Sequence, residues 1–247
     1  TKWAGKTVHF ARETDSTNLW GKRAWREEGA GHGELFVAEY QSAGRGRFTR
    51  RWSAPPDSAI TMSILICPEF SPQKAPMLTL VMGLSVAQAV ADIGLDVGIK
   101  WPNDVVVSRK KICGILTEMT MKQDKIGCAV IGVGINVNMK SFPEEMADKA
   151  TSLYLESGHP FDRAQVVGLV MEHFEEQTED LSGLKPDYEK MLANLNQPVR
   201  VLDQNDPYEG TARGINAGGE LLVERADGTV EEVNSGEVSV RGLYSYV

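Results

Sequence analysis

Short runs of apolar and β-branched residues recur through the first 195 residues, and glycine, proline or polar turn residues bound each run. This pattern predicts strands. The predicted strands cover residues 6–10, 35–40, 59–66, 97–101, 105–107, 111–119 and 126–137. Helices are predicted over residues 76–92, 162–181 and 187–195. A further helix, to about residue 26, follows the capping side chains of Asp15, Ser16 and Thr17. We therefore expect an α+β fold in which helices back a mixed sheet.

The pattern changes after residue 196, where short strand-like segments alternate with the turn sequences NAGG, ADG and NSGE. These segments cover residues 199–202, 208–215, 221–224, 229–233 and 238–241. Short strands at this spacing are typical of a small barrel. The chain is therefore predicted to divide into a larger domain over residues 1–195 and a smaller domain over residues 196–247.

The segment from Gln41 to Trp52, QSAGRGRFTRRW, is locally basic in a chain whose formal net charge is -8. Its positive charges are those of Arg45, Arg47, Arg50 and Arg51. Gly44 and Gly46 would permit positive φ and let backbone N–H groups approach a ligand. Each guanidinium offers a planar fork that matches phosphate or carboxylate oxygens. The residues alone leave two interpretations open: a phosphate-binding loop, or a solvated basic loop with turn glycines.

A second segment, KWPND (100–104), places polar side chains near strand ends. The strand is interrupted at Pro102, and a turn over residues 108–110 leads into the next strand. This arrangement is predicted to bring together the side chains of Lys100, Asn103, Asp104 and Lys111.

The last strand of the larger domain contains two glycines, Gly132 and Gly134, among its apolar residues. Glycine in a strand suits a backbone that another group approaches closely. Asn136 follows at the end of this strand.

The composition limits the class of partner and compartment. A pI near 5.1 argues against nucleic acid as the main partner, because affinity for a polyanion comes from Lys and Arg. Cys67, Cys113 and Cys128 lack metal-ligand spacing and are predicted to be free thiols. No run of the sequence reads as a signal peptide or membrane span, so we expect a cytoplasmic protein. The scattered histidines are predicted to be structural; they are His9, His32, His159 and His173.

Five motifs in order resemble those of the biotin protein ligases: STN (16–18), EYQSAGRGR (39–47), KWPND (100–104), KKICGIL (110–116) and GVGINVN (132–138). The resemblance covers nearly the whole chain. It implies a catalytic fold like that of class II aminoacyl-tRNA synthetases, followed by an SH3-like barrel. Only 15 residues precede Ser16, so the form expected is the one without an N-terminal DNA-binding domain, and no DNA binding is expected.

The resemblance also implies a two-step reaction. The carboxylate of biotin attacks the α-phosphate of ATP with the help of Mg²⁺, which gives biotinyl-5′-AMP and pyrophosphate. A lysine of a carrier protein then attacks the acyl carbon and expels AMP. The carrier expected is the biotin carboxyl carrier domain of an acyl-CoA carboxylase. The segment Gln41–Trp52 is expected to be mobile when empty and to close over the adenylate.

The site residues are implied by the same resemblance, position by position. Catalysis is assigned to Lys111, Arg45 and Arg47, with Lys111 bridging the biotin carboxylate and the α-phosphate. Biotin is expected to contact Ser16, Thr17, Asn18, Gln41, Gly44, Arg45, Gly46, Arg47, Lys111 and Gly114. ATP is expected to contact Arg45, Arg47, Arg50, Trp52, Lys100, Asn103 and Asn136. Asp104 is a candidate Mg²⁺ ligand or a turn cap. For Asn18, Trp52 and Asn136, a structural role is the alternative.

Two other functions remain open at this stage. One is a lipoate or octanoate ligase or transferase of the same fold. The motifs GRGR and KWPND favour a biotin ligase over this alternative. The other is a biotin or nucleotide sensor without catalysis. Sheet edges in such folds pair two subunits or dock the carrier, so a homodimer is also compatible with the sequence.

Overall fold

The larger part of the chain is built on one seven-stranded sheet. The computed structural model describes residues 1–48, 50–179, 181–203, 206–235 and 239–242. The strands are β1 (Val8–Thr14), β2 (Leu35–Gln41), β3 (Ala59–Ile66), β4 (Val97–Lys100), β5 (Asp104–Val107), β6 (Lys110–Lys122) and β7 (Lys125–Asn136). Their order is β1-β2-β3-β7-β6-β5-β4. β1 and β2 are parallel and the other neighbours are antiparallel, which confirms the predicted mixed sheet.

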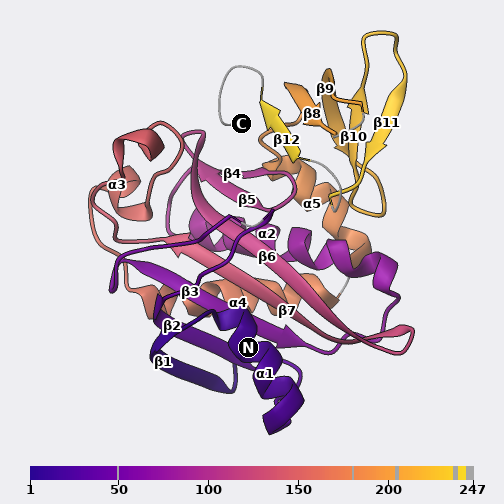
Figure 1. Cartoon of the computed structure of the whole chain (residues 1–247). Helices are drawn as coiled ribbons and strands as arrows, with labels where there is room; N and C mark the ends of the chain where they lie inside the picture. The colour runs from indigo at the N-terminus through magenta and orange to yellow at the C-terminus, as the bar shows by residue number, and fades with distance from the viewer. Residues whose placement is uncertain (49, 180, 204–205, 236–238, 243–247) are drawn as a thin grey trace.

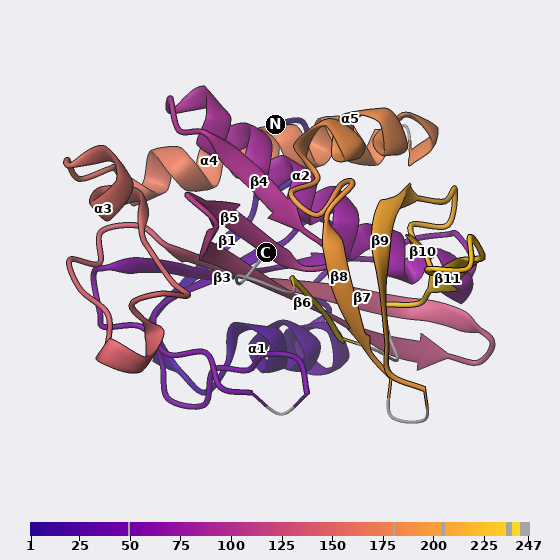
Figure 2. The same cartoon turned by 90° about the horizontal axis from the view of Figure 1, so that it is seen from above.

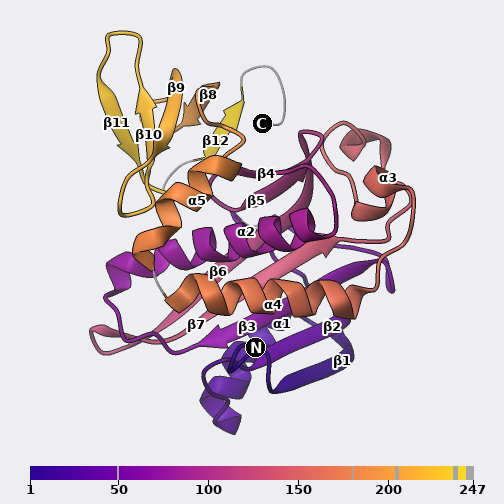
Figure 3. The same ribbon diagram turned by 180° about the vertical axis from the view of Figure 1, so that it is seen from behind.

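Helices lie on both faces of this sheet. They are α1 (Thr17–Arg23), α2 (Ala75–Asp92), α3 (Leu153–Ser157), α4 (Arg163–Glu179) and α5 (Leu184–Met191). Figure 2 shows α1 on one face and α2, α4 and α5 on the other. α2 and α4 run side by side, as seen in Figure 3. The first helix was expected to run to about residue 26; its end is a π-helical turn over Ala24–Glu28.

α2 is the central helix of the core, and most of its side chains are buried. Pro76 lies in the first turn of α2, where a backbone N–H would have no partner within the helix, so its absence in proline costs no hydrogen bond. Gly94, just beyond the end of α2, has φ 89°. The helical segment Pro72–Asp92 is long and apolar enough to span a membrane. However, 72% of its most apolar window is buried, as in the core helix of a globular domain. The three cysteines are free thiols, as predicted.

Two helices differ from the prediction. α5 runs over Leu184–Met191, whereas residues 187–195 were expected. It begins earlier because Pro186 is tolerated in a first turn, and it ends earlier because Leu192 is extended and forms a parallel bridge to Ile99. α3 was not predicted, because its five residues carry too little periodic signal. Ser152 caps α3 by accepting a hydrogen bond from the N–H of Leu155.

The C-terminal part forms a separate antiparallel sheet, which agrees with the predicted fold class. Its strands are β8 (Pro198–Leu202), β9 (Tyr208–Ile215), β10 (Leu221–Glu224), β11 (Val230–Val233) and β12 (Ser239–Gly242). Their order is β11-β10-β9-β8-β12. In Figure 1 this sheet lies beyond β4 and α5. The prediction began the last strand at Val238, which lies outside the described residues.

The C-terminal sheet is joined to the larger domain through the KWPND segment. The indole of Trp101 is buried, and its Nε1–H donates to the carbonyl oxygen of Gly219 at 3.0 Å. The backbone N–H of Trp101 donates to Oδ1 of Asn194, just before β8. A Cβ on Gly219 would lie 2.5 Å from Leu80 of α2, so the β9–β10 turn packs tightly on that helix. Residues next to Trp101 are thereby fixed relative to the C-terminal sheet.

The backbone of the N-terminal segment is bound by the carboxylate of Glu175 on α4. Glu175 accepts hydrogen bonds from the backbone N–H groups of Lys2, Trp3 and Ala4 at 2.6 to 2.9 Å. Burial disfavours its charged form, but these backbone donors outweigh burial and lower the pKa of Glu175 to about 2. The ionised carboxylate therefore contributes to the stability of the fold.

We expect Glu175→Gln to lower the melting temperature by a few degrees at neutral pH. The folded-state pKa lies below the ordinary value of 4.5, so the contribution of the carboxylate is present above that value. It is lost as the pH falls toward about 2. Thermal unfolding of both proteins at several pH values tests this, with Glu172→Gln on the exposed face of α4 as the control. A difference that does not shrink in acid would contradict the assignment.

Candidate active site

The segment between β2 and β3 folds back on itself as a narrow loop. The N–H of Gly46 donates to the carbonyl of Arg50 at 2.7 Å, and the N–H of Trp52 donates to the carbonyl of Gly44 at 3.1 Å. Neither glycine has positive φ, so that part of the prediction is wrong. A Cβ on Gly44 would lie 2.3 Å from the carbonyl oxygen of Trp52. Gly44 is thus required by the close approach of two backbone segments.

The indole of Trp52 lies against the glycines of the central strands. A Cβ on Gly134 of β7 would be 2.3 Å from the ring, and one on Gly114 of β6 would be 3.5 Å from it. The indole N–H is buried and has no hydrogen-bond partner among the described residues. The two glycines therefore leave a slot of aromatic-ring thickness on the α1 face of the sheet.

Polar side chains at the start of α1 form a buried network with β2 and β3. The N–H and Oγ1 of Thr17 donate to Oε1 of Gln41 at 2.8 and 3.1 Å. Oγ of Ser63 lies 2.7 Å from Thr17 Oγ1 and 2.6 Å from Asn18 Oδ1. A Cβ on Gly132 would lie 2.2 Å from Asn18 Oδ1. Ser16 is buried but makes no side-chain cap.

Lys111 and Asp104 form an ion pair beside Gly114. Nζ of Lys111 donates a hydrogen bond to Oδ1 of Asp104, and both side chains are largely buried. A Cβ on Gly114 would lie 2.9 Å from Nζ of Lys111. In a regular strand, residues three apart point to opposite faces. Here the pairing with β5 slips by one residue at Ile112, and this bulge turns Lys111 to the face of Gly114.

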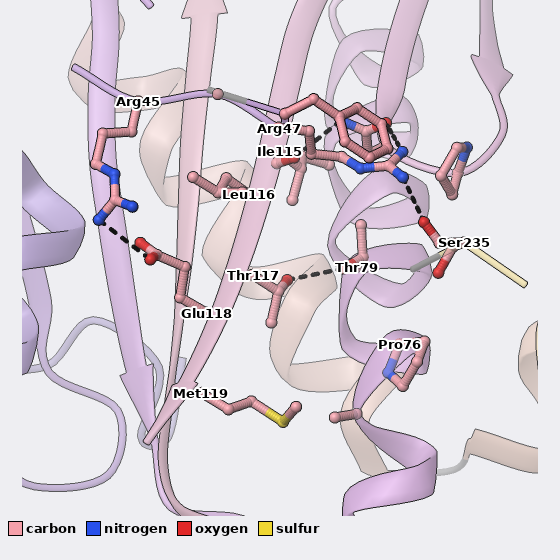
Figure 4. A pocket seen from close by; sticks show the side chains of 15 residues that line it. Arg45, Arg47, Pro76, Thr79, Ile115, Leu116, Thr117, Glu118, Met119 and Ser235 are labelled. Carbon is pink, nitrogen blue, oxygen red and sulfur yellow. Dashed lines mark hydrogen bonds and ion pairs between the residues drawn. The ribbon is translucent and has the colours of Figure 1, made fainter. Parts of the chain in front are cut away.

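The two loop arginines reach opposite sides of an adjoining cavity of about 460 Å³ (Figure 4). Nη1 of Arg45 lies 3.2 Å from Oε1 of Glu118 on β6. Nη1 of Arg47 donates to Oδ1 of Asn103 at 3.0 Å, and its Nη2 donates to the carbonyl of Ser235 in the C-terminal part. The cavity lies between β6, α2 and the loop, with Ser235 at its C-terminal side. Arg47 therefore links the loop to both domains.

Positive charge prevails around the cavity. Burial lowers the pKa of Arg47, which nevertheless stays a cation at neutral pH. Burial also opposes ionisation of Glu118, but hydrogen bonds from Lys22 and Asn18 and the charges of Lys22 and Arg45 lower its pKa overall. The cations Arg45, Arg47, Lys22 and Lys111 thus outnumber the carboxylates Glu118 and Asp104. Such a site suits anionic ligands.

Other sequence-predicted residues have mainly structural contacts or lie apart. The amide of Asn136 is buried and donates to the carbonyl of Thr151 at 3.0 Å. Lys100 is buried on β4, opposite Asp104 in the β4–β5 pairing, so the predicted approach of these residues is observed. Arg50 is exposed. All four histidine rings pair or stack outside the cavity: His9 and His173 with carboxylates, His32 with Trp3, and His159 with Phe161.

Four residues at the site were not predicted: Ser63, Glu118, Lys22 and Ser235. Ser63 carried a signal, since it is one of two hydroxyl residues within the apolar run AITMSILI. Glu118 also interrupts an apolar strand. Lys22 lies four residues after Asn18, hence on the same face of α1. The carbonyl of Ser235 could not be found from sequence, because any residue supplies one.

Comparison with known proteins places these features in context. The model of the biotin/lipoate A/B protein ligase family matches residues 10–136, and that of the biotin protein ligase C terminal domain matches residues 195–241. The protein named bifunctional ligase/repressor BirA from Bacillus spizizenii is 37% identical over an alignment of 219 residues, and the match covers 85% of this chain and 67% of that protein. The biotin--[acetyl-CoA-carboxylase] ligase of Mycobacterium tuberculosis is 32% identical over 83% of this chain and 78% of its own length.

A solved structure agrees over nearly the full length. The biotin protein ligase from Aquifex aeolicus in complex with biotin and ATP superimposes with a TM-score of 0.82 and 33% identity. The match covers 96% of this chain and 99% of the Aquifex chain.

Proposed function

Because this chain belongs to the biotin protein ligase family, we propose that it joins biotin to a carrier protein in two steps. In the first step it forms biotinyl-5′-AMP and pyrophosphate from biotin and ATP. In the second it transfers the biotinyl group to a lysine of a biotin carboxyl carrier domain. We further propose residues 1–195 as the catalytic domain and residues 196–247 as the C-terminal domain. The observation that carries the proposal is the cluster of Lys111, Arg45 and Arg47 around glycine-lined strands.

The glycine slot supports the binding of biotin. Its floor is formed by Gly114 and Gly134, which admit a flat apolar group. The hydroxyl and amide groups of Thr17, Gln41 and Ser16, at the start of α1 and the end of β2, would form its polar rim. The bicyclic ring of biotin has a polar ureido edge, so its pocket needs apolar walls and a few polar groups that form directed hydrogen bonds. We therefore place the biotin ring at the slot and its carboxylate toward Lys111.

The adenylation step brings a carboxylate to a polyanion, and charge repulsion is its main obstacle. Lys111 would leave Asp104 to bridge the biotin carboxylate and the α-phosphate. Arg45 and Arg47 would stabilise the charge that develops on the transferred phosphoryl oxygens. Lys100 and Asn103 would hold the nucleotide from the KWPND segment, and Arg50 would contribute from the loop. These roles require positively charged groups that are positioned before the substrates bind. Arg45 and Arg47 already line the cavity.

Magnesium would be held mainly by the phosphates. Among the described residues no group of three or more His, Cys, Asp or Glu side chains is close enough to hold a metal ion. Asp104, paired with Lys111, would supply one oxygen. Mg²⁺ commonly binds through one or two carboxylates plus substrate phosphates, so the residues present fit such a site. The bound ion would neutralise charge on the phosphates.

The carrier would dock at the open edge of β6. β5 pairs with β6 only up to Gly114, so within the described part of the chain the residues of β6 beyond Ile115 have no strand partner on that side. This edge borders the cavity, and Met119 and Met121 are 41% and 48% exposed. Unpaired strand edges recruit a strand from another chain. We place the second subunit of a homodimer, which the sequence permits as an alternative to a transient complex with the carrier, at the same edge.

Gly132→Ala tests the assignment of the biotin slot. The new methyl group would lie 2.2 Å from Asn18 Oδ1, so Asn18 must move, and the Ser63 and Thr17 hydroxyls move with it. We expect the KM for biotin to rise about fivefold or more, and the KM for ATP to change much less, since Asn18 reaches the nucleotide side only through Glu118 and Arg45. Gly168→Ala on α4, where the methyl group meets nothing within 4 Å, is the control. An equal rise in both KM values would argue against the assignment.

One assay tests the function as a whole. The protein is incubated with ATP, Mg²⁺ and a carrier domain, with biotin, lipoate or octanoate offered separately, and the carrier is weighed by mass spectrometry. We expect a mass increase with biotin alone, and none when the acceptor lysine is replaced by arginine. Transfer of lipoate or octanoate would favour the related ligases or transferases, and no transfer at all would favour a sensor.

A further inference from the structure

Glu118 occupies a position between three parts of the site. It lies on β6 at the cavity wall, and its side chain is 17% exposed. Oε2 accepts a hydrogen bond from Nδ2 of Asn18 at 2.9 Å. Oε1 accepts one from Nζ of Lys22 at 2.8 Å and lies 3.2 Å from Nη1 of Arg45. Glu118 thus joins α1, the central sheet and the basic loop.

The Asn18 contact fixes the carboxylate on its α1 side. The amide of Asn18 also donates to the carbonyl of Leu116 at 3.1 Å, and its oxygen lies 2.6 Å from Ser63 Oγ. The amide is thereby held in one orientation. A carboxylate fixed in this way leaves its other oxygen, Oε1, facing Lys22 and Arg45.

The two cations at Oε1 differ in their freedom. Lys22 is 14% exposed and lies on α1, whereas Arg45 is 47% exposed and lies on the loop. A largely buried carboxylate that loses every cation pays a desolvation penalty, and one that keeps a cation avoids most of it. Arg45 is therefore the cation that can leave, because Lys22 remains behind to pair with Glu118.

We propose that Glu118 is a positioning residue that acts through Arg45. It holds the guanidinium at the cavity wall before an anionic ligand arrives, and Lys22 allows it to release Arg45 to the phosphates of ATP. The inference rests on the proposed function only in taking ATP as the ligand. It assigns to Glu118 and Lys22 opposite effects on ATP affinity: Glu118 competes with the phosphates for Arg45, and Lys22 weakens that competition.

The test measures ATP affinity without catalysis. Binding of α,β-methylene-ATP, whose bridging carbon blocks adenylate transfer, is followed by calorimetry with and without biotin. We expect Glu118→Gln to tighten nucleotide binding about fivefold and Lys22→Met to weaken it about fivefold. The affinity for biotin should stay within about twofold in Glu118→Gln, because glutamine still accepts the hydrogen bond from Asn18.

A double-mutant cycle shows whether the effect passes through Arg45. In an Arg45→Met background, Glu118→Gln should no longer tighten nucleotide binding. Glu39→Gln is the matched control, since it removes the same charge from a comparably buried acid, 24% exposed and paired with Arg163. It should leave the affinity unchanged. Shifts in the same direction for Glu118→Gln and Lys22→Met, or an unchanged effect of Glu118→Gln without Arg45, would overturn the inference.

Failure of this inference is distinguishable from failure of the proposed function. If the chain transfers lipoate, or transfers nothing, the binding measured without biotin still decides the role of Glu118. A wild-type chain that does not bind the nucleotide would overturn it directly, since Arg45 would then have no phosphate to meet.

Discussion

Lys111→Ala is expected to reduce biotin-dependent exchange of pyrophosphate into ATP by about 100- to 1,000-fold. The ammonium of Lys111 lies beside Gly114 and Asp104, where we place the biotin carboxylate and the α-phosphate. Alanine would leave both anions without the cation between them. It would also leave Asp104 as an added negative charge at the point of attack. The loss should appear mainly in kcat, because charge on the phosphoryl oxygens grows in the transition state.

Lys110→Ala is the matched control for Lys111→Ala. It removes the same charge one residue earlier on β6, from a side chain whose Nζ donates to the carbonyl of Ala147. We expect near-normal exchange in this variant. Circular dichroism of both variants excludes misfolding as the cause. Normal exchange in a folded Lys111→Ala protein would show that the catalytic assignment is wrong.

Arg47→Gly is expected to release biotinyl-AMP about 10- to 100-fold faster while forming it at a less affected rate. Arg47 is the loop residue that bonds both Asn103 of the larger domain and the carbonyl of Ser235 in the C-terminal part. Those two bonds hold the loop across the cavity. Without these two bonds the loop is not held closed over biotinyl-AMP. The rate of biotinyl-AMP release should therefore change more than the rate of its formation.

The off-rate can be measured by chasing labelled adenylate from the enzyme with unlabelled biotin and ATP. Arg51→Gly is the control, because it introduces the same glycine and removes the same charge from an exposed position of the same loop. It should release the adenylate at the wild-type rate. An unchanged off-rate in Arg47→Gly would disprove the anchoring role.

The main elements of the fold follow from local patterns. The run Ala59–Ile66 is bounded as predicted, because a short, mainly apolar run rich in isoleucine between turn residues is typical of a buried strand. The helix over α2 was found from its period and from Pro76 and Gly94. The approach of Asn103, Asp104 and Lys111 followed from two strands joined by a short turn.

The missing parts of the site depend on contacts between distant segments. The bulge at Ile112 turns Lys111 toward Gly114, and no local pattern marks the slipped residue. Glu118 and Lys22 come from different elements, 96 residues apart, so their pairing appears only after the sheet and α1 are assembled. Gly44 was expected to act through positive φ, whereas the packing of Trp52 against its backbone is what excludes a side chain.

The position of Trp52 has a kinetic consequence. Its ring rests on Gly134, in the slot where we place biotin, so the ring and the ligand compete for one volume. The binding-competent form is then the fraction of molecules in which the ring has swung out, and the apparent dissociation constant exceeds the intrinsic one by the inverse of that fraction. The observed rate of biotin association would reach a plateau at high biotin concentration. This plateau would equal the rate at which the Trp52 ring leaves the slot. The loop that we expect to close over biotinyl-AMP would thus also control the entry of biotin into the slot.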